Sequence, residues 1–256
     1  MDVSYTIAVA GKGGTGKTTI SSLVIRHFVR AGTTPVFAVD ADSNFNLNDQ
    51  LGVEVKSTIG SSREEMKRRI TANEAPQGMS KDDWIQLQMS ADLIEAEGFD
   101  LLVMGRPEGP GCYCAANNTL RRHLEILSGN YPVVVIDNEA GMEHLSRRTT
   151  AKIDLLLLVS EPSPIGIMTA ARIRDLAKEM EIQVARIGLV INRVPGPELG
   201  ARLVEEARGR GLDVLGTVPL DDAVVEQAMS HLPAFRLADD APAVRAIESI
   251  LSTVVL

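Results

Sequence analysis

Nine residues near the start of the chain have the composition of a phosphate-binding loop. They are Gly11, Lys12, Gly13, Gly14, Thr15, Gly16, Lys17, Thr18 and Thr19. Glycines let the backbone curl around a phosphate, so several N–H groups and the positive end of the next helix point at one anion. In such loops the lysine near the end reaches the β- and γ-phosphates, and the hydroxyl that follows it binds Mg²⁺. The spacing therefore predicts that Lys17 and Thr18 bind ATP or ADP together with Mg²⁺.

Carboxylates follow two of the apolar segments. Asp40 directly follows the segment 35–39, with Asp42 two residues later, and Asp137 directly follows the segment 133–136. In open α/β sheets ligands gather at the carboxyl ends of the strands, so we expect Asp40 and Asp42 to face the phosphates. Each also has a simpler interpretation: Asp40 and Asp42 as helix-capping or turn residues, and Asp137 as the start of an ordinary loop.

Other polar and turn residues lie at comparable places. Gly141 follows Asp137 four residues later, Asn192 and Arg193 follow the apolar run 187–191, and Pro219 follows the run 214–218. The roles of these four residues follow only from a family resemblance, which is described below. A turn-forming role is an open alternative for Asn192.

The two cysteines of the chain are one residue apart. Cys112 and Cys114 follow a segment rich in glycine and proline, which excludes a regular helix before them. In locally extended backbone, residues i and i+2 project to one side, so both sulfurs can face one ion. Two thiolates are half of a tetrahedral site, and a symmetric second copy of the chain would supply the other two.

Three other interpretations of the cysteines stay open. Free cysteines are often small buried apolar residues. A disulfide between residues so close together would be strained, and a reducing compartment disfavours it. His123 or His144 is able to complete a metal site, although nothing in their spacing selects them.

Short apolar runs alternate with amphipathic stretches along the whole chain. The runs that we predict as strands are Thr6–Ala10, Val36–Val39, Leu101–Met104, Val133–Ile136, Leu155–Val159, Ile187–Ile191 and Val214–Val218. Several lack polar alternation, which is typical of strands covered on both faces in a parallel sheet. The pattern predicts one α/β domain over residues 1–256, with a doubly wound, mostly parallel sheet and helices on both faces. A polar insertion occupies about 57–98, and the metal-binding loop about 105–116.

Length and charge narrow the class of protein. The 256 residues are 45% hydrophobic, enough for a large core, and carry a net charge of −8. This charge disfavours nucleic-acid binding and stable association with anionic membranes, because both need clustered cations. The chain begins without a basic leader, and no stretch approaches the roughly 20 apolar residues that span a bilayer. We therefore expect a cytoplasmic protein.

The loop with an additional early lysine resembles the deviant Walker A motif of the MinD, partition-ATPase and nitrogenase iron-protein group, which has the P-loop NTPase fold. In that group the lysine at the position of Lys12 crosses a dimer interface to the nucleotide of the other subunit, so the resemblance implies an ATP-dependent homodimer. A solvent-facing lysine that only adds positive potential is the alternative. The resemblance also implies that Asp42 orients the attacking water and that Asp40 helps to hold the magnesium hydration shell.

The same resemblance gives roles to the later strand ends. Asp137 would bind Mg²⁺ through water, as in a Walker B segment, and the Gly141 amide would contact the γ-phosphate. Asn192, with Arg193 beside it, would read the adenine edge, and the segment at Pro219 would border the base.

The early-lysine loop combined with Glu-Gly-Pro-Gly-Cys-Tyr-Cys at residues 108–114 resembles the CooC-type nickel-insertion ATPases that mature carbon monoxide dehydrogenase. A sister type serves acetyl-CoA synthase. The resemblance implies that Cys112 and Cys114 bind Ni²⁺ or Zn²⁺ across a nucleotide-controlled dimer, which serves one of these client enzymes. An iron-sulfur reductase of the nitrogenase iron-protein type and a positional switch of the MinD or partition type are the alternatives. No motif assigns a role to residues 221–256.

Overall fold

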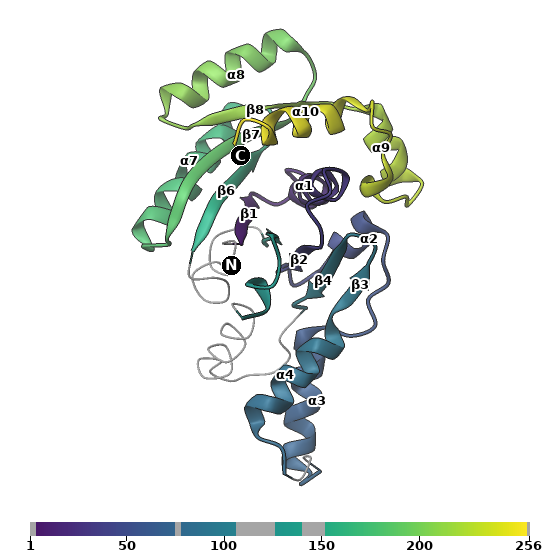
Figure 1. The fold of residues 1–256 in the computed structure, drawn as a ribbon. Helices are drawn as coiled ribbons and strands as arrows, with labels where there is room; N and C mark the ends of the chain where they lie inside the picture. The colour runs from purple at the N-terminus through teal and green to yellow at the C-terminus, as the bar shows by residue number, and fades with distance from the viewer. Residues whose placement is uncertain (1–3, 75–77, 106–125, 140–151, 255–256) are drawn as a thin grey trace.

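A computed structural model describes residues 4–74, 78–105, 126–139 and 152–254. Within these residues a single sheet of eight strands has the order β3-β4-β2-β5-β1-β6-β7-β8 (Figure 1). The strands are β1 (Tyr5–Gly11), β2 (Val36–Asp40), β3 (Ile94–Ala96), β4 (Phe99–Val103), β5 (Val133–Asp137), β6 (Ile153–Ser160), β7 (Val184–Val194) and β8 (Val214–Pro219). Only the β3–β4 pair among them is antiparallel. The predicted doubly wound, mostly parallel sheet is confirmed.

Helices cover both faces of this sheet. The described helices are α1 (Lys17–Arg30), α2 (Leu47–Leu51), α3 (Ile59–Thr71), α4 (Lys81–Asp92), α7 (Pro164–Glu179), α8 (Pro197–Gly209), α9 (Asp222–Met229), the 3₁₀ turn η1 (Ala234–Arg236) and α10 (Pro242–Leu251). Helices α1 and α10 pack on one face, and α7 and α8 pack on the other. Because both faces are covered, β5 is buried at every position, which is why its sequence lacks polar alternation.

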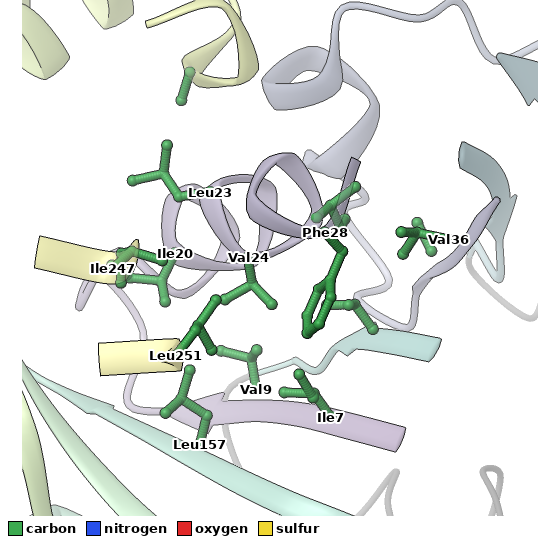
Figure 2. Packing of buried hydrophobic residues seen from close by; sticks show 14 of the residues in the cluster. Ile7, Val9, Ile20, Leu23, Val24, Phe28, Val36, Leu157, Ile247 and Leu251 are labelled. Carbon is green, nitrogen blue, oxygen red and sulfur yellow. The ribbon is translucent and has the colours of Figure 1, made fainter. Parts of the chain in front are cut away.

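Helix α1 lies at the centre of one of the two cores. Its buried side chains Ile20, Leu23, Val24 and Phe28 recur at helical spacing. In Figure 2, Val24 and Phe28 point toward the sheet, and Ile20 lies beside Ile247 of α10. Burying one such side chain stabilises the fold by about 1.5–3 kcal/mol. This packing fixes the start of α1, and therefore the loop before it, against the end of β1.

The buried guanidinium of Arg26 on α1 binds the C-terminal segment, for which no sequence motif gave a role. Arg26 is 1% exposed and forms an ion pair with Asp239. Its guanidinium also donates to the carbonyl oxygen of Leu237 at 3.0 Å and lies 3.7 Å from Glu248 on α10. The segment therefore closes one face of the core, and its ion pairs compensate a charge that would be costly to bury alone.

The polar insertion contains α3, α4 and β3. The charged run 63–69 lies on α3, where Glu65 bonds both Arg68 and Arg69 at the surface, as expected for a solvated helix face. Strand β3 was not predicted, because three residues are too few to show a periodic pattern. It pairs with β4 through the turn at Gly98.

The predicted strand 101–104 is shifted in the structure, since β4 begins at Phe99 and ends before Met104. The polar Asp100 beside Phe99 concealed the beginning of this strand, although Phe99 is 3% exposed. No described helix combines the length and the apolar composition that crossing a bilayer requires.

Candidate functional site

The phosphate-binding loop connects β1 to α1. Gly16 precedes the helix with a φ of 90°, a left-handed conformation that glycine adopts without strain. Because Gly16 has no side chain, it leaves the first N–H groups of α1 without a side-chain acceptor. The Lys12 carbonyl accepts from the Lys17 ammonium at 3.3 Å and from the Thr15 hydroxyl at 2.9 Å. The loop thus presents N–H donors and the buried Lys17 to one small region, as an anion site requires.

Two residues at the end of β7 donate hydrogen bonds to the backbone of this loop. The Asn192 side chain donates to the Thr15 carbonyl at 2.8 Å, and the Arg193 guanidinium donates to the Gly14 carbonyl at 2.9 Å. A Cβ atom on Gly16 would lie 2.4 Å from the Asn192 amide nitrogen. Asn192 is therefore a positioning residue for the loop, a contact that the sequence did not indicate.

A small cavity opens beside the loop. Asn192, Arg193 and Pro219 line it together with Thr19 and the apolar residues of β8 and α9. The structure thus brings together the three residues predicted to border a base. One Asn192 amide hydrogen serves Thr15, and its oxygen accepts from the Arg193 backbone at 2.9 Å.

Two buried carboxylates face each other across adjacent strands. Asp40 and Asp137 are partners in the β2–β5 register and are at most 1% exposed. Burial raises the pKa of Asp40 to about 6, although the backbone N–H groups of Leu47 and Asp42 stabilise its anion. Burial, together with the charge of Asp40, raises the pKa of Asp137 to about 7, although Thr18 and Ser21 hydrogen-bond to it.

These groups suit a hard divalent cation. Carboxylate and hydroxyl oxygens are the ligands that Mg²⁺ prefers, and Thr18 lies next to Asp137. Two buried acidic groups with raised pKa values lack sufficient positive charge nearby, and a cation would supply it. The residues present therefore fit the predicted magnesium ion.

A polar cleft with a volume of about 380 Å³ lies in front of the loop. Lys17, Thr18, Asp42 and Arg193 are among its lining residues. Asp42 is oriented by its own loop, since its backbone N–H donates to Asp40 at 3.0 Å and its carboxylate accepts from the Asn44 N–H at 2.8 Å. The predicted phosphate residues and Asp42 thus share one cleft. Lys12, in contrast, is exposed and does not line the cleft.

Four polar residues near the cleft were missed in the sequence. Ser21 donates to Asp137 at 3.0 Å, and Ser43 donates at 3.2 Å to Glu139, which lines the cleft. Asn138 is 1% exposed and donates to the Val9 carbonyl. Ser21 lies on α1 one turn after Thr18, and Asn138 and Glu139 directly follow Asp137. Helical spacing and the strand end were therefore the available signals.

Part of the predicted site lies outside the described residues. Gly141, Cys112, Cys114, His123 and His144 belong to this part. Among the residues that the structure describes, no group of three or more histidine, cysteine or acidic side chains is arranged to hold a metal. The described chain leads toward the cysteine segment through Met104, whose backbone N–H donates to the Asp40 carbonyl at 2.9 Å.

Comparisons with known proteins agree with this geometry. Residues 6–234 match the CobQ/CobB/MinD/ParA nucleotide binding domain. An uncharacterized ATP-binding protein of Methanocaldococcus jannaschii is 40% identical over 249 residues, 97% of this chain and 98% of that protein. The carbon monoxide dehydrogenase accessory protein CooC of Rhodospirillum rubrum is 33% identical over 246 residues, 91% of this chain and 90% of that protein.

Solved structures show the same fold. The MinD cell division protein of Aquifex aeolicus superimposes with a TM-score of 0.69 at 20% identity, over 98% of this chain and 96% of that chain. This similarity concerns the fold alone.

Proposed function

The chain belongs to the CobQ/CobB/MinD/ParA family of nucleotide-binding domains and is an ATPase of this type, and from this premise we propose that it delivers a metal ion to a client enzyme. The observation that carries the proposal is the similarity to the CooC accessory protein over nine-tenths of both chains. The paired Cys112 and Cys114 supply thiolates that suit Ni²⁺ or Zn²⁺. The client is carbon monoxide dehydrogenase or acetyl-CoA synthase.

The proposed catalytic roles use residues in and beside the cleft and the predicted strand-end residues. Lys17 and the loop N–H groups hold the β- and γ-phosphates, and Thr18, Asp40 and Asp137 hold Mg²⁺. Bound there, Mg²⁺ neutralises charge that develops on the phosphate oxygens. Asp42 orients a water that attacks the γ-phosphorus, the bond from that phosphorus to the bridging oxygen breaks, and ADP and phosphate leave. The Gly141 amide contacts the γ-phosphate, while Asn192, Arg193 and Pro219 border the base.

The metal role requires two chains. In the proposed state two copies close around two ATP molecules, and Lys12 of each reaches the nucleotide of the other. The exposure of Lys12 outside its own cleft supports this role. Closure brings two Cys112 and two Cys114 sulfurs to one ion. Because coupling between binding sites is reciprocal, bound metal strengthens ATP binding by the same factor as ATP strengthens metal binding.

The test measures metal content and oligomeric state with and without a nonhydrolysable ATP analogue. The expected result is one ion per two chains for the wild type, lost in the double variant Cys112→Ala/Cys114→Ala. Tyr113→Ala is the matched control, since it changes the same segment and keeps both thiols. Stoichiometric metal binding by the double variant, or tight binding by a lone subunit without nucleotide, would reject the shared site.

A companion test separates the lysines. Lys17→Ala is expected to abolish ATP binding, whereas Lys12→Ala is expected to bind ATP and fail to dimerise. Lys152→Ala, whose side chain is 61% exposed, is the control for loss of one surface charge. A Lys12→Ala protein that dimerises with ATP like the wild type would remove Lys12 from the interface.

The second candidate function is a positional switch, because the family includes MinD and ParA. Such a switch binds a membrane surface or DNA in its ATP state. Co-sedimentation with anionic vesicles and with DNA, in the presence of ATP, tests this function. Nucleotide-dependent binding to either, together with no metal uptake, would favour it over metal delivery.

A further inference from the structure

Helices α3 and α4 project away from the sheet, as Figure 1 shows, and a groove with a volume of about 310 Å³ lies between them. Its walls are mainly apolar, with Met66 and Ile70 on α3 and Ile85 and Met89 on α4. Ile70 is 45% exposed. Apolar side chains in protein interiors are close-packed. The side chains that line this groove lack such contacts on one side, and an apolar occupant would supply them.

The rim of the groove is cationic. Arg63 and Lys67 of α3 line it, in a chain whose net charge is −8. The neighbouring Arg68 and Arg69 are both bonded to Glu65. The ammonium group of Lys67 on this rim therefore favours a segment that carries acidic residues beside its apolar ones.

A buried acceptor lies in the lining of the same groove. Asp92 is 2% exposed, and its Oδ1 accepts from Ser57 at 2.6 Å and from Ser62 at 2.7 Å. Its Oδ2 is buried and has no hydrogen-bond partner among the described residues. The two serine hydroxyls hold Asp92 in place at the end of α4, beneath the apolar walls of the groove.

The groove is attached to the strand end that leads to the cysteines. The Gly60 N–H at the start of α3 donates to the Met104 carbonyl at 2.9 Å. A Cβ atom on Gly105 would lie 2.5 Å from the Thr58 hydroxyl, so the backbone there lies directly against the N-cap of α3. Cys112 follows Gly105 by seven residues in the sequence. The groove is thus joined to the last described residues before the sequence segment that carries the thiols.

We propose that the α3–α4 groove is the docking surface for the client metalloenzyme, which inserts an amphipathic segment with apolar and acidic side chains. This assignment rests on the proposed metal-delivery function and names the surface that selects the recipient. A bilayer with anionic headgroups shares the charge preference, but a flat surface leaves a recess between two helices unfilled.

The test measures the affinity of the dimer, with a nonhydrolysable ATP analogue, for nickel-free carbon monoxide dehydrogenase and, separately, for nickel-free acetyl-CoA synthase by biolayer interferometry. Ile70→Asp and Lys67→Glu are each expected to weaken binding at least about tenfold, as expected when a central contact of an interface is lost. Met229→Asp, on the 79% exposed Met229 of α9, is the matched control and is expected to stay within about twofold of the wild type. ATP turnover and metal stoichiometry of all variants are expected to match the wild type.

Each outcome separates the two proposals. Client binding that the groove variants leave unchanged would overturn the groove assignment and leave metal delivery intact. A wild type that binds neither enzyme would overturn metal delivery to these clients, and the groove assignment with it. Groove variants that lose binding to phosphatidylglycerol vesicles but keep client binding would identify the groove as a membrane surface and overturn its assignment to the client.

Discussion

Replacing Asp137 by asparagine is expected to stabilise the nucleotide-free protein at neutral pH. The pKa of Asp137 is about 7 in the fold and 3.8 in an exposed chain. Because this pKa is higher in the folded protein than in the unfolded chain, the folded protein binds the carboxyl proton more tightly. Ionisation of Asp137 therefore lowers the free energy of unfolding, and this loss grows as pH rises from about 4 to about 7. Asparagine imitates the neutral acid, and its oxygen still accepts from Ser21.

The size of this effect follows from the difference in pKa. About three units correspond to a cost of about 4 kcal/mol above pH 7, an upper value because relaxation around the carboxylate reduces it. At pH 5 the same relation leaves a cost of about 2 kcal/mol. The advantage of Asp137→Asn should thus increase by about 2 kcal/mol between pH 5 and pH 8.

Urea denaturation at these two pH values, without nucleotide or Mg²⁺, measures the effect. Asp213→Asn is the control, because this side chain is 51% exposed, and we expect a change within about 0.5 kcal/mol. The gain in stability should be accompanied by a loss of Mg²⁺-dependent ATP hydrolysis, because the carboxylate that destabilises the empty site is the group that would bind the cation. A variant that is no more stable than the wild type at pH 8 would refute the reasoning.

Three further predictions concern the loop and the core. Gly16→Ala is expected to abolish ATP binding, because its Cβ would meet the Asn192 amide at 2.4 Å; titration with a fluorescent ATP analogue measures this, and wild-type affinity would contradict it. Asp239→Ala is expected to destabilise the fold by about 1–3 kcal/mol by removing an ion-pair partner of the buried Arg26, and an unchanged thermal midpoint would argue against that role. Ile247→Ala, under α1, is expected to cost about 2–5 kcal/mol in guanidinium denaturation because it leaves a cavity, and a cost below about 1 kcal/mol would mean that the site collapses around it.

The sequence by itself determined the class of fold and the phosphate loop. Runs such as Val133–Ile136 are apolar on both faces, and only a sheet covered on both sides buries them. The glycines, Lys17 and Thr18 lie within a few residues of one another, so local spacing already specifies their chemistry. The family and its ATPase type are confirmed, whereas the metal role of Cys112 and Cys114 stays a prediction.

Tertiary structure alone decided what surrounds that loop. The contact of Asn192 with Thr15 joins residues 177 positions apart, and the facing of Asp40 and Asp137 depends on the β2–β5 register. The groove between α3 and α4 likewise has no pattern in the chain, since the charged run on α3 is typical of any solvated helix. These features depend on which distant segments of the chain pack together, and local spacing does not encode that packing. The burial that raises the pKa of Asp40 and Asp137 is one example.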